Sequence, residues 1–167
     1  MNHELEAIFS RYNLKGSIVI HLIDKKIQIY NPERASERFT PASTFKILNT
    51  LIALEEQAIS DINDIIRWDG HFYEYPSWNG DQTLASAFKG SCVWFYQELA
   101  RRIGREKYKK YFEQISFGEL SEQFEETNFW LDDSLKISAL EQIDFLKEVY
   151  QRTLPLVQRT MTFLRKS

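Results

Sequence analysis

The chain has 167 residues, of which 43% are hydrophobic and 27% are charged, and its formal net charge is −3. A chain of this length buries about 70% of the surface of its unfolded form, so we expect a single domain over residues 1–167 and no second domain. The slightly acidic balance excludes proteins that bind nucleic acids or anionic membranes through a basic patch.

The N-terminal part predicts a helix followed by a β-hairpin. Apolar residues recur at helical spacing within residues 4–12, which predicts a short leading helix. Two runs rich in β-branched residues, 16–23 and 27–30, are separated by a polar turn and predict paired strands. Neither run carries a group of reactive side chains, so we interpret the hairpin as scaffold and the polar residues 31–38 as a loop.

A helix expected over residues 43–56 is the centre of the chain. It follows Pro41 and is apolar over most of its circumference, so it belongs in the interior. Ser43 and Lys46 lie three residues apart in its first turn and therefore on one face. Free backbone N–H groups and the helix dipole favour negative charge there, as on a serine alkoxide. Burying polar groups is costly unless they are paired, which favours a functional role for both residues.

The S-x-x-K pattern is weak support by itself. Ordinary use of serine and lysine predicts about one match in a chain of this length. A second match, from Ser86 to Lys89, is followed at once by Gly90, so it lies at the end of a helix and away from the positive dipole. On the pattern alone, a structural interpretation, in which Ser43 caps the helix and Lys46 is solvated, outweighs a catalytic one.

The middle of the chain predicts turns followed by two helices. Trp68-Asp69-Gly70 predicts a turn, and residues 73–80 predict an aromatic loop. A short helix over residues 83–89 precedes an amphipathic helix over residues 91–103. Ser91 stands at the start of the second helix, where its simplest role is that of an N-cap.

The rest of the chain adds helices but no clear strand. We expect a helix over residues 105–114, a loop over 119–126 and an apolar core cluster at 129–131. A helix that begins with a capping box follows over 138–152, and a last helix starts at 155. The predicted fold class is therefore α+β, mostly helical with one hairpin. A lone hairpin is marginally stable and leaves open edges, so the chain has fewer strands than such a fold needs.

The residue types present exclude several kinds of site. Cys92 is the only cysteine, so no internal disulfide forms, and the three histidines lack the spacing of a zinc site. No segment is long and apolar enough to span a bilayer, and residues 1–6 lack the apolar part of a signal peptide. We expect no metal and no bound cofactor, and either a cytoplasmic location or a targeting segment that has been left off.

Several motifs follow one another in a specific order. They are Pro41-Ala42-Ser43-Thr44-Phe45-Lys46, Trp68-Asp69-Gly70, Asp81-Gln82-Thr83-Leu84, Ser91-Cys92-Val93-Trp94, Phe129-Trp130-Leu131 and Ile137-Ser138-Ala139-Leu140-Glu141-Gln142. The ordered set resembles the class D (oxacillinase-type) serine β-lactamases and the related penicillin-sensing domains of receptors, from about Gly16 onward. S-x-x-K is a signature of serine β-lactamases and penicillin-binding proteins. The resemblance implies a β-lactamase/transpeptidase-like fold.

The resemblance also implies roles for individual residues. Ser43 would attack the lactam carbonyl and form an acyl-enzyme, with its backbone N–H in the oxyanion hole. Lys46, with its pKa lowered by burial, would take up carbon dioxide and act as an N-carboxylated general base. Ser91 would carry a proton to the leaving nitrogen, and Trp130 would hold the carbamate through its indole N–H. The residues expected to surround Lys46 are Phe45, Val93, Trp130 and Leu131.

Three departures from the family pattern affect the expected activity. Phe117-Gly118-Glu119 replaces the usual Tyr/Phe-Gly-Asn, and the carboxylate would bring negative charge near a site for anionic substrates. Cys92 lies inside the Ser-x-Val motif, where we interpret it as a variable buried position and not as a nucleophile. The family's Lys-Thr/Ser-Gly motif does not occur before Ser167. We therefore expect a truncated domain that lacks the C-terminal sheet strands, the second oxyanion N–H and the basic residues for the lactam carboxylate.

Three functions stay open on the sequence. The first is a serine β-lactam hydrolase, and the second is a penicillin-binding sensor domain that is acylated at Ser43 without turnover. The third is an inactive fragment that folds with a strand-completing partner chain or as a homodimer. The family implies a β-lactam as the small-molecule substrate and a periplasmic or secreted location.

Overall fold

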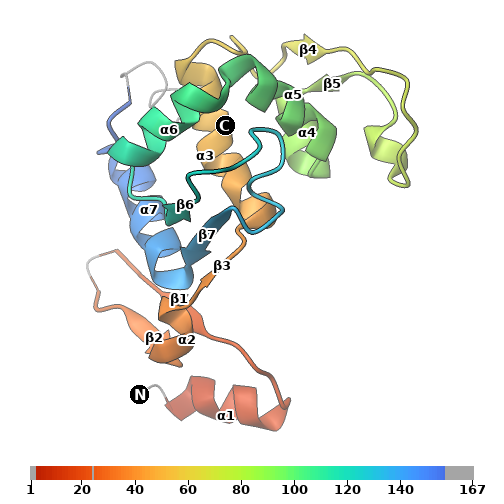
Figure 1. Ribbon diagram of the computed structural model, residues 1–167. Coiled ribbons are helices and arrows are strands. Elements are labelled where there is room, and N and C mark those ends of the chain that lie inside the picture. The colour runs from red at the N-terminus through yellow and green to blue at the C-terminus, as the bar shows by residue number, and fades with distance from the viewer. Residues whose placement is uncertain (1–2, 24, 157–167) are drawn as a thin grey trace.

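Figure 1 shows the computed structural model, which describes residues 3–23 and 25–156. The α-helices are α1 His3–Arg11, α2 Pro32–Ser36, α3 Lys46–Glu55, α4 Leu84–Gly90, α5 Val93–Ile103, α6 Arg105–Gln114 and α7 Ala139–Gln151, and the 3-10 helices are η1 Ala42–Phe45 and η2 Pro76–Trp78. The strands are β1 Ile18–Ile20, β2 Gln28–Tyr30, β3 Arg38–Phe39, β4 Ile65–Ile66, β5 Gln82–Thr83, β6 Glu119–Leu120 and β7 Leu135–Ser138. The expected mixture of many helices and few strands is confirmed.

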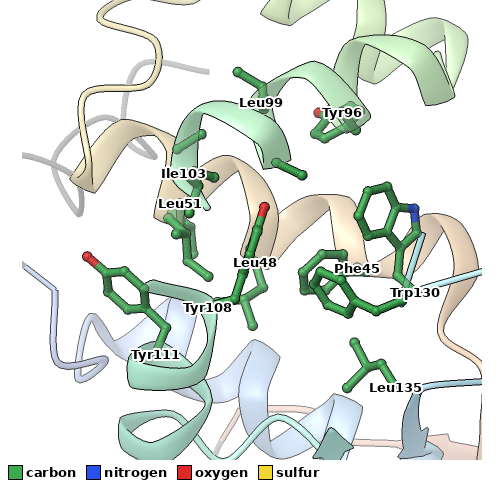
Figure 2. Close-up of a cluster of buried hydrophobic side chains, with 14 of the residues drawn as sticks. Phe45, Leu48, Leu51, Tyr96, Leu99, Ile103, Tyr108, Tyr111, Trp130 and Leu135 are labelled. Atoms are coloured by element: carbon green, nitrogen blue, oxygen red, sulfur yellow. The ribbon is translucent and has the colours of Figure 1, made fainter. Parts of the chain in front are cut away.

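Helix α3 lies at the centre of the hydrophobic core (Figure 2). Leu48, Leu51 and Ile52 are fully buried, and the helix packs against α5. Burial of one such side chain stabilises the folded state by about 1.5–3 kcal/mol. The prediction of an interior helix is therefore confirmed, but the α-helix begins at Lys46, because residues Ala42–Phe45 form the tighter turn η1.

The N-terminal helix and hairpin are confirmed. Strands β1 and β2 are antiparallel, with Ile18 opposite Tyr30 and Ile20 opposite Gln28. Helix α1 packs on the hairpin through Phe9, whose ring centroid lies 4.2 Å from that of Tyr30. The paired stretch is shorter than the apolar runs predicted. The hairpin remains a scaffold element beside α7 (Figure 1).

The prediction of a loop over residues 31–38 is wrong. The segment contains α2, and Asn31 caps it by accepting a hydrogen bond from the Arg34 backbone N–H at 3.2 Å. Pro32 stands at the first position of the helix, where its missing N–H is no loss. The capping residue and the proline were both readable in the sequence, but the helix is too short to show an apolar period.

The prediction of a loop over residues 119–126 is wrong in part, because β6 begins at Glu119, and the hairpin is not the only set of paired strands. Strand β7 pairs with both β3 and β6 in an antiparallel sheet of order β3-β7-β6. Gly118 has φ +69, and a Cβ there would lie 2.1 Å from the Lys136 carbonyl oxygen, so only glycine lets β6 approach β7. Strands of two residues, such as β3 and β6, carry no alternating pattern to predict them.

The helices of the second half begin and end close to the predicted residues. Helix α6 has the expected bounds, and α4 is displaced by one residue because Thr83 is its cap. In α7 the capping box is present: Ser138 N–H donates to Glu141 Oε2 at 2.8 Å, and Glu141 N–H donates to Ser138 Oγ at 3.2 Å. Pro155 lies in a bend rather than a helix, and most of the expected last helix falls outside the described residues.

Candidate active site

The turn η1 presents Ser43 at the surface at the start of the central helix. The Ala42 N–H donates to the Trp130 carbonyl at 3.0 Å, and the Thr44 hydroxyl donates to the Pro41 carbonyl at 2.7 Å. Gln142 of α7 donates to the same Thr44 hydroxyl at 2.7 Å. These bonds hold an exposed serine on the end of a buried helix, a position from which it can reach a ligand in solution.

The backbone N–H of Ser43 is available to an oxyanion. Within residues 3–23 and 25–156 it has no hydrogen-bond acceptor, whereas the next N–H, that of Thr44, donates to the Pro41 carbonyl at 3.1 Å. A free N–H at the first turn of a helix is the ordinary donor for developing negative charge on a carbonyl oxygen. The structure therefore supplies one such donor beside the serine hydroxyl.

Lys46 is buried at the first position of α3, with 8% of its surface exposed. Burial lowers the pKa of its amine below the ordinary value of 10.5, as the apolar sequence around it predicts. The ammonium also lies 5.9 Å from the ring centroid of Phe88 of α4. The contact with Phe88 was not predicted, because the sequence placed this residue only within the second S-x-x-K match.

Ser91 lies between Ser43 and Lys46. Its hydroxyl accepts a hydrogen bond from Lys46 Nζ, and its Oγ lies 2.9 Å from Ser43 Oγ. The sequence predicted that the side chains of Ser43 and Lys46 share one face of the helix and converge on one point; in the structure both contact the Ser91 hydroxyl. The result is a continuous line of polar groups from a surface hydroxyl to a buried amine.

The prediction that Ser91 caps the following helix is wrong. Ser91 ends α4 in the left-handed conformation, with φ 55 and ψ 35, and Cys92 precedes α5. Residues other than glycine adopt this conformation at a cost of about 1–3 kcal/mol, and they do so most often at functional sites. The turn places the Ser91 hydroxyl on the side of α4 that faces η1. The sequence signal for this turn was Gly90, which ends the helix.

The side chains expected to surround Lys46 lie in different environments. Phe45 is fully buried beneath the site, where its ring stacks on Trp130 with the centroids 5.5 Å apart (Figure 2). Trp130 is 2% exposed, and Val93 is partly buried at the start of α5. Leu131 is 39% exposed, so its assignment to the core is wrong. Its hydrogen bond from N–H to Asn128 places it in a surface turn.

Trp130 differs from the other tryptophans in its hydrogen bonding. Trp68, Trp78 and Trp94 each donate the indole N–H to a backbone carbonyl at 2.9 Å. Among the described residues the Trp130 indole N–H has no acceptor, although the ring is almost fully buried. This donor is free to hold an oxygen of a ligand or of a modified side chain.

Cys92 and Glu119 lie in places that reduce their expected influence on the site. Cys92 is fully buried, and burial raises the pKa of its thiol, so it stays protonated and unreactive at neutral pH. Glu119 pairs with Arg38 at 2.6 Å, and Arg38 also binds Glu141. The Glu119 carboxylate is therefore held in an exposed ion pair, and Arg38, which it shares with Glu141, offsets only part of the negative charge.

No helix in the described part of the chain has the length and apolar character needed to cross a membrane. In the same residues no group of three or more His, Cys, Asp or Glu side chains is placed to hold a metal ion. A hollow of about 590 Å³ lies away from Ser43, between the hairpin and α7, and is lined by His21, Ile23, Ile143, Leu146 and Tyr150 among others.

Comparison with known proteins identifies relatives over almost the whole chain. The model of the family "Penicillin binding protein transpeptidase domain" matches residues 12–163. The probable β-lactamase YbxI of Bacillus subtilis (strain 168) is 41% identical over 152 residues, which are 90% of this chain and 57% of YbxI. The regulatory protein BlaR1 of Bacillus licheniformis is 36% identical over 166 residues, which are 98% of this chain and 27% of BlaR1.

Solved structures agree with these matches. The class D β-lactamase FUS-1 (OXA-85) from Fusobacterium nucleatum subsp. polymorphum is 36% identical, with a TM-score of 0.93 over 99% of this chain and 69% of that one. A class D β-lactamase from Bacillus subtilis is 39% identical, with a TM-score of 0.91 over 99% of this chain and 69% of that one. The chain spans little more than half the length of the curated β-lactamases it matches, such as YbxI at 57%.

Proposed function

Because the chain belongs to the penicillin-binding protein transpeptidase family and, within it, to the class D β-lactamases, we propose that its site hydrolyses β-lactams with Ser43 as the nucleophile. One observation carries the proposal: the line of hydrogen bonds from the exposed Ser43 hydroxyl through Ser91 to the buried Lys46. A hydroxyl at the surface is activated in this way by a base in the interior.

The acylation step uses groups that the chain itself provides. Ser43 Oγ bonds to the lactam carbonyl carbon as its proton moves to Ser91, and Ser91 passes its own proton toward Lys46. The Ser43 N–H donates to the oxyanion that forms. When the tetrahedral intermediate collapses, the C–N bond of the lactam breaks, and Ser91 returns a proton to the leaving nitrogen. The product of this half-reaction is an ester on Ser43.

We further propose that Lys46 is modified by carbon dioxide to a carbamate. Two features of this chain fit that group: burial lowers the pKa of Lys46, which favours the neutral amine that reacts with carbon dioxide, and the Trp130 indole N–H has no acceptor among the described residues. When present, the carbamate supplies a general base near neutral pH. Lys46 and Trp130 would hold it, while Ser43 and Ser91 keep their roles.

Hydrolysis of a chromogenic cephalosporin tests the proposal. We expect a burst followed by steady turnover, stimulation by bicarbonate, and complete loss of both phases in Ser43→Ala. Lys89→Ala is the matched control, because it disrupts the second S-x-x-K match at an exposed position and should leave turnover unchanged. Turnover that persists in Ser43→Ala would reject Ser43 as the nucleophile.

A penicillin-sensing domain is the second candidate, and the extensive match to the regulatory protein BlaR1 favours it. Acylation would be the same in both cases, so the difference lies in the ester on Ser43. Intact-mass measurement over time separates the two: an adduct that disappears supports the hydrolase, and an adduct that persists supports the sensor. The periplasmic or secreted location belongs to both candidates and is testable by cell fractionation.

The third candidate is a catalytically inactive fragment that keeps its fold only with a partner chain or a second copy. The exposed apolar residues Ile23, Leu146 and Tyr150 beside the hairpin favour it, since they offer a surface for strands from a partner chain or a second copy. Size-exclusion chromatography with light scattering is the test. A monomer that unfolds cooperatively would argue against the need for a partner, and a dimer or higher assembly would support it.

A further inference from the structure

The connection over residues 67–80, which includes the aromatic loop predicted over 73–80, packs against the turn that carries Ser91. The loop contains η2, and its Trp78 is held between two neighbouring rings, with centroids 5.6 Å from Tyr73 and 4.7 Å from Tyr75. The side-chain amide of Gln82 binds the loop by donating hydrogen bonds to the carbonyls of Ser77 and Gly80. Trp78 therefore has ring contacts with two tyrosines in a loop that Gln82 also binds, although it lies in a connection between strands.

Trp78 contacts both sides of the turn that contains Ser91. Its indole N–H donates to the carbonyl of Gly90, the residue before Ser91, at 2.9 Å. Its own carbonyl accepts the indole N–H of Trp94, in the first turn of α5, at 2.9 Å. Trp78 therefore binds the link between α4 and α5 on both sides, at Gly90 and at Trp94.

The turn needs such support because of its conformation. Ser91 has φ 55 without being glycine, and such a conformation persists only where the surroundings determine it. The same conformation directs the Ser91 hydroxyl to Lys46 Nζ and to Ser43 Oγ. A relaxed turn would move this hydroxyl away from both partners.

We propose that Trp78 is a positioning residue for Ser91, acting through the Gly90 carbonyl. Without the indole donor, that carbonyl loses its partner, and the Ser91 turn relaxes toward the conformations that serine prefers. A displacement of about 1 Å in a group that transfers protons lowers the rate by up to about 100-fold. The inference rests on the proposed function of Ser91 for its effect on rate, but its effect on geometry does not depend on any substrate.

The test compares two tryptophans of the same loop. Trp78→Phe removes the donor to Gly90 and keeps an aromatic ring in the hydrophobic contact. Trp68→Phe is the matched control, because Trp68 also donates to a backbone carbonyl at 2.9 Å, that of His71, which is not part of the Ser91 turn. The readouts are the acylation rate constant of Ser43 with a fluorescent penicillin over a range of pH, and the NMR shifts of Ser91 Cβ and Lys46 Cε.

We expect Trp78→Phe to slow acylation by about 10- to 100-fold with little change in penicillin affinity, to alter the pH profile and to shift both NMR signals. Trp68→Phe should do none of these. Acylation by Trp78→Phe within about twofold of the parent chain, or an equal loss in Trp68→Phe, would overturn the inference.

Two further measurements cover the cases in which the parent chain is not acylated or Trp78→Phe does not fold. If the parent chain is not acylated, the proposed function fails, and the NMR shifts alone decide: a change confined to Trp78→Phe supports the positioning role, and no change rejects it. If Trp78→Phe does not fold, benzothienylalanine at position 78, which replaces only the N–H by sulfur, repeats the test with the bicyclic ring intact. Thermal unfolding of each variant, followed by circular dichroism, shows whether that variant is folded.

Discussion

Lys46 is the residue at which stability and reactivity conflict most clearly. A buried ammonium is costly, yet an amine of lowered pKa beside two serine hydroxyls is what proton transfer from Ser43 requires. Active sites often combine low stability with reactivity in this way. The balance can be measured, because an apolar side chain of similar length removes the charge and keeps the packing.

Lys46→Met should raise the free energy of unfolding by about 1–2 kcal/mol at neutral pH and abolish acylation of Ser43. The unfolded chain binds the lysine proton more tightly than the folded one, since burial lowers the folded pKa below 10.5. The penalty to the parent chain is therefore full below the lowered pKa and fades as pH rises through it toward 10.5. The gain from Lys46→Met should shrink over the same range in urea unfolding experiments.

The matched control for this prediction is Lys89→Met, which changes an exposed lysine. It should alter stability by no more than about 0.5 kcal/mol and show no such dependence on pH. A loss of stability in Lys46→Met at neutral pH would show that Lys46 is stabilised by its partners more than it is destabilised by burial.

Glu119→Asn restores the residue usual in the family and tests whether the carboxylate matters. The Arg38–Glu119 pair is exposed, so its loss should change the free energy of unfolding by less than about 1 kcal/mol. The acylation rate of Ser43 should stay within about twofold of the parent value, because the Glu119 side chain is 72% exposed and solvent screens its charge. A large gain in acylation rate would instead show that the charge of Glu119 reaches the site.

At the scale of elements, α3 is joined to α6 by one buried hydrogen bond. The Tyr108 hydroxyl donates to Asn49 Oδ1 at 2.7 Å, and both residues are fully buried. Asn49 Nδ2 has no partner within the described residues, so only the oxygen of this buried amide forms a hydrogen bond. This bond fixes the position of α3, whose first residue is Lys46.

Tyr108→Phe should lower the free energy of unfolding by about 1–3 kcal/mol, because it leaves the buried Asn49 amide without any partner. The double variant Asn49→Leu and Tyr108→Phe should recover part of this loss, since it removes both polar groups. Tyr150→Phe is the control, as Tyr150 is 69% exposed and should change stability by less than about 0.5 kcal/mol. Additive effects of Asn49→Leu and Tyr108→Phe would contradict the coupling.

Elements with a strong period or a capping signal were predictable from the sequence. Helices α3, α6 and α7 and the hairpin carry such signals, and the capping box of Ser138 and Glu141 is present as predicted. Strands of two residues, such as β3 and β6, carry none, since their pairing is set by contacts distant in sequence. The left-handed turn at Ser91 was missed because Gly90 marks only the end of the helix, whereas the conformation of the next residue is supported by contacts with Trp78.

At the scale of the whole molecule, stability is unevenly distributed. The residues of α3 and α5 supply about half of the fully buried side chains among the described residues, whereas those of β1 and β2 are only partly buried or exposed. Regions with few buried apolar contacts open locally at a lower free energy than the core. The site is built on the stable part, because Ser43, Lys46 and Ser91 all lie at ends of helices that enter the core.

Hydrogen exchange followed by mass spectrometry should show this difference. Amides of β1 and β2 should exchange at least about 100-fold faster than those of the middle of α3, because the hairpin opens without global unfolding. Equal protection of the hairpin and α3 would mean that the hairpin is as stable as the core, as expected if a partner chain or second copy covers it. Repeating the measurement at several protein concentrations distinguishes these cases.

The central claim concerns Ser43, whose position beside Ser91 and Lys46 the sequence predicted only in part. The most direct measurement is the intact mass of the chain after acid quenching at a series of times, from the start of the reaction with benzylpenicillin onward, followed by peptide mapping. We expect a single covalent adduct on Ser43 at the early times, absent from Ser43→Ala and present in the Ser86→Ala control. A chain that is unmodified at every quench time, or an adduct that also forms in Ser43→Ala, would contradict this assignment.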